Sequence, residues 1–174
     1  MKLLVLLLLL PVISHCECPS TTKHPFIHIG NFEVANETVI KYFYSGNIHA
    51  SSEMALELCK IFEMQLTTFK DTKQEKSFRT NFAKFFNGRD SFVVLGANTT
   101  TAGSKTNWKW VNGEKLNFEL LWGDDQPNNE GNEEFCLCLD ETDPLLYHDI
   151  SCKEKYPFVC KEVWTYEKKL VKVL

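Results

Sequence analysis

Amide and carboxylate side chains are concentrated between Gln126 and Asp149. The segment from Gln126 to Glu134 reads Gln-Pro-Asn-Asn-Glu-Gly-Asn-Glu-Glu, and Tyr-His-Asp follows at 147–149. Ca²⁺ takes about six to eight oxygen ligands and accepts carboxylates and amide carbonyls together. Because Pro127 restricts the backbone between two amide residues, their side chains can be held toward one ligand at a low entropy cost. The candidate binding residues are Gln126, Asn128, Glu134, His148 and Asp149.

His148 differs from the other four candidates because a hard cation such as Ca²⁺ does not prefer ring nitrogens. Its ring can still donate a hydrogen bond to a hydroxyl group. The alternative is a partly exposed histidine at a strand end with no ligand role. The stretch 124–134 carries five carboxylates and no basic residue. Such a run is usually a solvated face, but a bound cation would relieve its repulsion.

Catalytic motifs are missing from the chain. His148, Asp149 and Ser151 have the residue types of a hydrolytic triad, but neighbours in one strand do not converge as a triad does. There is no Gly-x-Ser-x-Gly, phosphate loop or His-Glu-x-x-His. A zinc site is also disfavoured, because no second Cys-x₂-Cys pair is present. We therefore expect a binding protein and not an enzyme.

The N-terminus predicts export. One lysine precedes an apolar run at 3–13, which is too short to span a bilayer and is typical of a signal peptide. We expect cleavage before Glu17, with cleavage after Ser14 as the alternative. No later run of eighteen apolar residues exists, so we expect a secreted, extracellular protein without a membrane span. The formal charge of −4, with no lysine and arginine cluster, argues against nucleic-acid binding.

Cysteine usage also fits an exported chain. Removal of residues 1–16 leaves six cysteines, an even number that indicates a disulfide framework. Spacing excludes a bond between Cys136 and Cys138, whose Cα atoms would lie roughly 6.6 Å apart in a strand with parallel side chains. Two sequons predict glycosylated surface positions at Asn36 and Asn98.

Two helices are expected early in the chain. Ser51 and Ser52 can cap the first, whose apolar positions recur at helical spacing: Met54, Ala55, Leu58, Cys59 and Phe62. The segment Thr72–Glu75 has the pattern of a capping box and precedes a stripe of Phe78, Phe82 and Phe85. We interpret that stripe as core packing.

Strands are expected mainly later. Runs rich in β-branched and aromatic residues occupy 38–44, 91–96, 135–139, 145–150 and 156–161. The stretch 97–134 has little periodicity and several glycines, which is typical of a functional or a disordered region. Its tryptophans and Phe118 argue against disorder. The predicted organisation is a signal peptide at 1–16, a lead at 17–37 without regular structure, one domain at 38–162, and a tail at 163–174. The fold class is α+β.

The residues between about 38 and 161 resemble a C-type lectin domain, in particular that of secreted single-domain insect lectins. Phe92–Gly96 stands where that family has a Trp-Ile-Gly-Leu strand, and Trp108–Gly113 with Trp122 matches its loop aromatics. Gln126-Pro127-Asn128 resembles the sugar-selecting tripeptide, and Tyr147-His148-Asp149 stands at the family's Trp-Asn-Asp, just before Cys152. The joint order and spacing of these motifs carry the resemblance.

The resemblance implies an α+β lectin-like fold with two disulfides, Cys59–Cys160 and Cys136–Cys152. It leaves Cys18 and Cys138, which would pair with each other or link two chains. It also implies one Ca²⁺ held by Gln126, Asn128, Glu134 and Asp149, with adjacent sugar hydroxyls completing the ion's coordination shell. The implied partners are glycans.

The tripeptide is a hybrid of the family's two common forms, Glu-Pro-Asn for mannose-type sugars and Gln-Pro-Asp for galactose-type sugars. Two carboxylates, from Glu134 and Asp149, give fewer ligand charges than either form and predict a weak Ca²⁺ site. The sugar type is therefore left open. The alternative function is Ca²⁺-independent binding of a protein or lipid partner through the same loop surface. Self-association through a disulfide or the tail is also left open.

Overall fold

Two four-stranded antiparallel sheets and two helices form the domain. A computed structural model of the chain describes residues 24–34, 38–85, 92–140, 142 and 146–165. The first sheet has the order β1-β2-β8-β3, with β1 at Ile27–Val34, β2 at Thr38–Tyr44, β3 at Gln65–Leu66 and β8 at Val159–Trp164. The second has the order β5-β4-β6-β7, with β4 at Phe92–Thr99, β5 at Trp108–Trp110, β6 at Glu134–Asp140 and β7 at Tyr147–Ser151.

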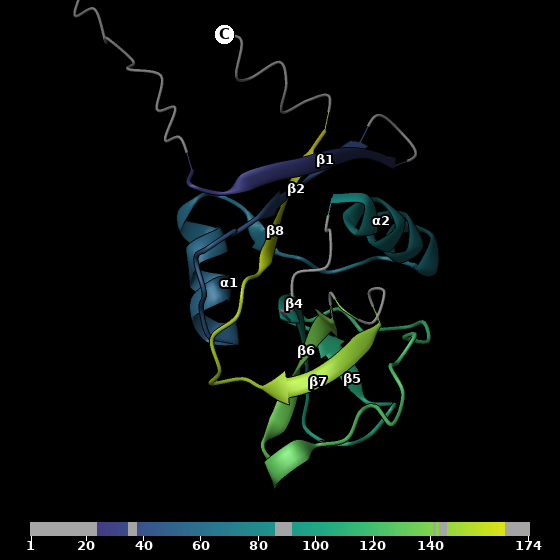
Figure 1. Cartoon of the computed structure of the whole chain (residues 1–174). Coiled ribbons are helices and arrows are strands. Elements are labelled where there is room, and N and C mark those ends of the chain that lie inside the picture. Colours follow the sequence, from purple (N-terminus) through teal and green to yellow (C-terminus); the bar gives the residue numbers. More distant parts are fainter. Residues whose placement is uncertain (1–23, 35–37, 86–91, 141, 143–145, 166–174) are drawn as a thin grey trace, which may run out of the picture.

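The two helices lie on either side of β8 (Figure 1). Helix α1 spans Ser52–Ile61 and α2 spans Thr72–Phe85. The α+β prediction is confirmed, with both helices early and most strands late. Within the described residues, no helix is both long enough and apolar enough to cross a bilayer.

Helix capping follows the sequence prediction closely at α1 and less closely at α2. The Ser51 hydroxyl accepts from the Met54 N–H, as expected for an N-cap. At α2 the cap lies one residue earlier than predicted, because the Asp71 carboxylate accepts from the Gln74 N–H at 2.9 Å. The Gln74 side chain in turn accepts from the Lys70 N–H. Aspartate caps as well as threonine does, so Asp71-Thr72 left two possible starting points.

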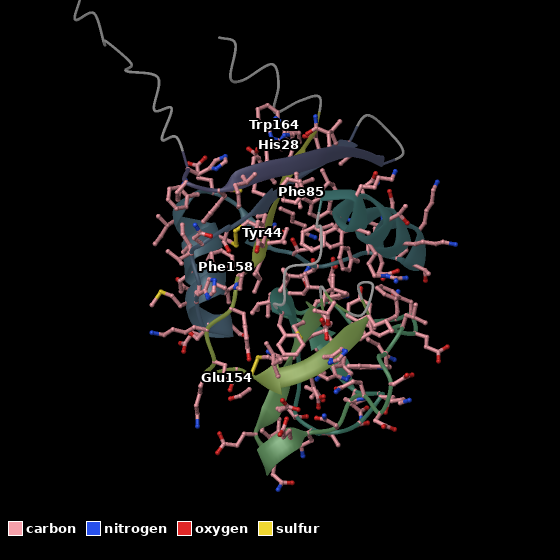
Figure 2. All side chains as sticks on the ribbon, viewed as in Figure 1. His28, Tyr44, Phe85, Glu154, Phe158 and Trp164 are labelled. Carbon is pink, nitrogen blue, oxygen red and sulfur yellow. A yellow bond between two sulfur atoms is a disulfide. The ribbon has the colours of Figure 1, made fainter. Side chains whose placement is uncertain are left out.

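Aromatic side chains fill the core between the sheets and α2. Phe78 and Phe82 are buried and stack with ring centroids 5.1 Å apart. Phe85, the third residue of the predicted stripe, is 41% exposed and contacts Tyr44 at the helix end. Figure 2 shows Tyr44 and Phe158 inside the molecule, whereas Trp164 lies at its outer edge. The core prediction therefore holds for two of the three phenylalanines.

The N-terminal lead contains a strand that the sequence did not predict. Residues 27–34 form β1, which pairs with β2 from end to end apart from a register shift between His28 and Gly30. Our expectation of irregular structure at 17–37 was wrong for this segment, and the regular structure begins before Thr38. The tail boundary also shifts, since Val163 and Trp164 belong to β8. Glycine, histidine and asparagine interrupt the β-branched pattern of β1, and pairing with β2 compensates for this low propensity.

Two disulfides close the fold. Cys59 of α1 bonds to Cys160 of β8, and Cys136 of β6 bonds to Cys152 just after β7. These are the two pairs that the resemblance implied. Cys138 is a free thiol with no exposed surface, and Cys18 lies outside the described residues.

A buried lysine lies at the junction of the two sheets. Lys161 is 7% exposed, and its Nζ donates to the Thr68 carbonyl at 2.7 Å and to the Thr68 hydroxyl at 2.6 Å. Burial lowers the pKa of Lys161 to about 8, and the Glu114 carboxylate opposes that shift only in part. The folded state therefore disfavours the charged ammonium.

The contribution of Lys161 to the free energy of unfolding should rise with pH between about 8 and 10, whereas the raised pKa values of buried Cys138 and Tyr147 contribute in the opposite direction. The unfolded chain holds this proton up to its ordinary pKa of 10.5, so over this window the unfolded state binds more protons than the folded state. The gain from Lys161 is on the order of 2 kcal/mol, measured by urea unfolding at the two ends of the window as the change in the difference between the wild type and Lys161→Met. Lys161→Met should lose this gain, while Lys155→Met, at an exposed position, should keep it. Parallel pH profiles for Lys161→Met and the wild type would contradict the assignment.

Candidate functional site

The loop before β6 and the strand β7 bring four of the predicted site residues to one hollow. This hollow has a volume of about 590 Å³ and is lined by Gln126, Asn128, Glu134 and Asp149 together with neighbouring residues. Glu134 is the first residue of β6, and Asp149 lies on β7, where it pairs with Leu137. Antiparallel pairing of β6 with β7 thus places the two carboxylates on the same loop-bearing end of the sheet.

Asp149 anchors the loop that carries the tripeptide. Its side chain is 3% exposed, and its two oxygens accept from the backbone N–H groups of Asn128 and Asn129, both at 2.9 Å. Hydrogen bonds to an ionised group are about twice as strong as neutral ones. Asp149 therefore fixes the position of the loop relative to β7.

A second set of bonds orders the loop from within. The Glu130 N–H donates to both the Asn128 amide oxygen at 3.0 Å and the Glu134 carboxylate at 2.8 Å. The Asn129 amide oxygen accepts from the Glu134 N–H at 3.2 Å. The Asn128 amide oxygen and the Glu134 carboxylate thus accept from the same N–H group and lie close together. The Gln126–Pro127 peptide bond is cis.

Two groups of this site are in unfavourable surroundings: one is a buried amide oxygen without a partner, and the other is a carboxylate among like charges. The Gln126 side chain is 9% exposed, and its amide oxygen is buried without a hydrogen-bond partner. Burial raises the pKa of Glu134, and the negative charges of Asp149, Glu130 and Glu154 raise it further. An unpaired buried acceptor and a crowded carboxylate are both stabilised by a cation.

The donor chemistry of the site fits Ca²⁺. Gln126, Asn128, Glu134 and Asp149 offer amide and carboxylate oxygens and no sulfur or nitrogen ligand. Within the described part of the chain, no group of three or more histidine, cysteine, aspartate and glutamate side chains could hold a metal ion. The oxygen donors at this hollow are therefore two carboxylates and two amides, which is the low ligand charge that the tripeptide predicts.

His148 also borders the hollow but makes different contacts. Its ring lies 5.5 Å from that of Phe92, and its Nε2 is 3.6 Å from the Asp140 carboxylate. On β7 it alternates with Asp149, so the two side chains start on opposite faces of the strand. His148 pairs across the sheet with Cys138. The structure therefore places it beside the other four residues and directs it toward Asp140.

Acidic side chains dominate the rim of the hollow. Glu130, Glu133 and Glu154 line it together with a single lysine, Lys153. Lys153 Nζ is 3.7 Å from the Glu133 carboxylate, in an exposed ion pair of small energetic value. Figure 2 shows Glu154 at the turn that follows β7. The net negative charge favours a cation and not an anion at this position.

A buried charge network supports β7 at its first residue. Tyr147 is fully buried and donates its hydroxyl hydrogen to the Glu75 carboxylate of α2 at 2.8 Å. The Arg79 guanidinium donates to the same carboxylate oxygen. Sequence reasoning did not predict this network. The signal that could have indicated it is the i, i+4 spacing of Glu75 and Arg79, with Glu75 on the same helix face as Phe78 and Phe82.

Of the two predicted glycosylation positions, Asn98 lies among the described residues and Asn36 does not. Asn98 is exposed on β4, across from Lys109 of β5. Asn36 lies outside the described residues, as do the predicted signal peptide and residues 166–174.

The family of the chain follows from its sequence. The family model described as the lectin C-type domain matches residues 48–162, which is most of the chain. The chain belongs to the C-type lectin domain family.

Individual relatives agree with this assignment. Mouse C-type lectin domain family 4 member K is 28% identical over 130 residues, which cover 70% of this chain and 37% of that protein. The C-type lectin galactose-binding isoform of Pseudechis australis is 38% identical over 55 residues, 31% of this chain and 34% of that protein. Two further relatives are matched over 51% and 60% of their own lengths, so the chain spans little more than half of them.

Solved structures share the fold. The C-type lectin domain of murine dendritic cell inhibitory receptor 2, solved in complex with an N-glycan, aligns with a TM-score of 0.58 at 18% identity. The alignment covers 76% of this chain and 94% of that domain. At this identity the likeness establishes the fold alone.

Proposed function

We propose that this C-type lectin domain binds glycans in a Ca²⁺-dependent manner at the hollow beside Asp149. Gln126, Asn128, Glu134 and Asp149 would hold the ion. A bound Ca²⁺ supplies coordination positions that two adjacent sugar hydroxyls can complete. The observation that carries the proposal is the buried, unpartnered amide oxygen of Gln126 next to two carboxylates.

The side chains of the site would have distinct tasks. Asp149 already holds the loop backbone and adds negative charge. Glu134 adds the second charge, and its raised pKa reflects a surrounding excess of negative charge that a cation would balance. The Gln126 and Asn128 amides can both donate to and accept from hydroxyls, which orients a sugar without strongly selecting one hydroxyl arrangement. His148 stays a predicted sugar contact.

Calorimetric titration of the purified domain with Ca²⁺ tests the proposal. Because few ligand charges are present, we expect weak binding, with a dissociation constant of about 10⁻⁴–10⁻³ M. Glu134→Ala should lower the affinity by about a hundredfold, since it removes one of two charges. Glu133→Ala is the matched control, because that carboxylate is exposed and forms an exposed ion pair with Lys153. The proposal fails if the wild type gives neither heat nor a stability gain at millimolar Ca²⁺.

A glycan array probed with and without chelator then identifies the sugar class. We also infer that the protein acts outside the cell, which the predicted leader and the two disulfides support. Glycan binding that persists in chelator and in Glu134→Ala would favour the Ca²⁺-independent alternative.

A further inference from the structure

A second hollow lies on the other side of the irregular region. It has a volume of about 850 Å³, within the range of about 300–1,000 Å³ that is usual for small-ligand sites. None of the residues lining the first hollow lines this one. The two lie close along the chain, because Trp122 borders the second hollow and Gln126 borders the first.

Three lysines give this hollow a charge opposite to that of the first. Lys105, Lys109 and Lys115 line it with one carboxylate, Glu119. All three lysines are exposed, and within the described residues none of them forms an ion pair. In an acidic protein, this is a local excess of positive charge.

Two of the lysines are direct neighbours across a β-bridge. Lys109 of β5 is bridged antiparallel to Lys115, so their side chains leave the hairpin on the same face. Like charges directly opposite each other destabilise a sheet. A bound anion would remove that repulsion, and no described carboxylate is paired with these lysines to do so.

Aromatic rings form the apolar side of the hollow. Trp108 is buried with its indole N–H donating to the Ser104 carbonyl, and Trp122 packs on it with ring centroids 5.4 Å apart. Trp122 and Phe118 are half-buried, so part of each ring faces the hollow. Around them are exposed hydroxyl and amide groups of Thr106, Asn107 and other residues, which can both donate and accept hydrogen bonds.

We propose that this hollow binds an acidic saccharide, with the aromatic rings against the sugar and the three lysines paired to its sulfate or carboxylate groups. A flat apolar wall beside hydroxyl-sized polar groups suits a sugar ring, and the lysines select a charged one. The site involves none of the Ca²⁺ ligands. Binding there is independent of Ca²⁺.

The test compares one polymer in three chemical forms. Binding of dextran sulfate, carboxymethyl dextran and unmodified dextran is measured by calorimetry in chelator, on protein carrying Asn98→Gln so that no glycan stands beside Lys109. We expect the sulfated or carboxylated form to bind and dextran to bind at least about tenfold more weakly. The better of the two charged forms identifies the acidic group. Replacing Lys105, Lys109 and Lys115 with glutamine should weaken that binding by about tenfold or more, and Phe118→Ala should weaken it while the salt dependence is retained.

The matched control removes the same charge elsewhere. Lys73, Lys76 and Lys84 are exposed on α2, and their replacement by glutamine should leave binding unchanged. Equal losses of binding in both triple variants would show that only the net charge matters. Poly-glutamate binding as well as the charged dextran would show the same, and either result would overturn the proposal. Loss of binding in Glu134→Ala would also overturn it, because the first hollow would then be the site. The proposed Ca²⁺ site can fail its own titration without affecting this result.

Discussion

Asp149→Ala should abolish the response of the domain to Ca²⁺ and also destabilise it in the absence of the ion. The substitution removes one of two ligand charges, so we expect at least about a hundredfold loss of Ca²⁺ affinity. It also leaves the N–H groups of Asn128 and Asn129 without their acceptors. Hydrogen bonds to a charged group contribute about 1.5–3 kcal/mol each, so the loss of two should lower the free energy of unfolding by about 3–6 kcal/mol in chelator.

Two comparisons separate these effects. Asp124→Ala removes an exposed carboxylate from the same acidic segment and should change neither quantity. Asp149→Asn can keep one acceptor oxygen and should recover part of the stability but little of the Ca²⁺ affinity. Thermal unfolding and calorimetry on the three variants measure both quantities. A Ca²⁺ response that survives in Asp149→Ala would exclude this carboxylate as a ligand.

Glu75→Ala should reduce the free energy of unfolding by about 3–5 kcal/mol, the usual effect of removing one partner from a buried ion pair. Glu75 is 4% exposed and accepts from both Arg79 and Tyr147. Its loss leaves a guanidinium and a phenol hydroxyl without an acceptor in the interior. Because Tyr147 begins β7, we also expect faster amide exchange along that strand.

The matched control for this prediction is Glu53→Ala. Glu53 and Glu75 both lie in the first turn of a helix and interact similarly with its dipole, but Glu53 is exposed. Urea unfolding of both variants should show a small loss for Glu53→Ala, below about 1 kcal/mol. Similar losses in the two variants would mean that the buried network adds nothing beyond the helix dipole.

Local sequence patterns predicted the helices and five of the strands well. Apolar spacing located α1 and α2, and β-branched runs located β2, β4, β6, β7 and β8 to within a few residues. β1, β3 and β5 were missed, because each is short or of mixed composition and owes its structure to a neighbouring strand. Pairing partners distant in sequence decide such strands, and single-sequence patterns do not contain them.

The site was predictable in its residue types but not in its contacts. The loop composition pointed to Gln126, Asn128, Glu134 and Asp149, which line one hollow. The sequence did not indicate that Asp149 would hold the loop backbone, nor that His148 would lie against Phe92 and Asp140. These contacts depend on the register of β6 with β7, which turn and strand chemistry alone does not define here.

The burial of the Cys138 thiol limits when disulfide exchange can take place in this part of the protein. Only a thiolate attacks a disulfide, and burial together with the charge of Asp140 raises the pKa of Cys138 well above its ordinary value. Once the domain has folded, we therefore expect Cys138 to exchange only slowly with the neighbouring Cys136–Cys152 bond. Scrambling between Cys136, Cys138 and Cys152 is confined to the period before β6 and β7 pair. We therefore infer that the choice between these sulfur atoms is made before the strands pair, and that the packed interior afterwards preserves it.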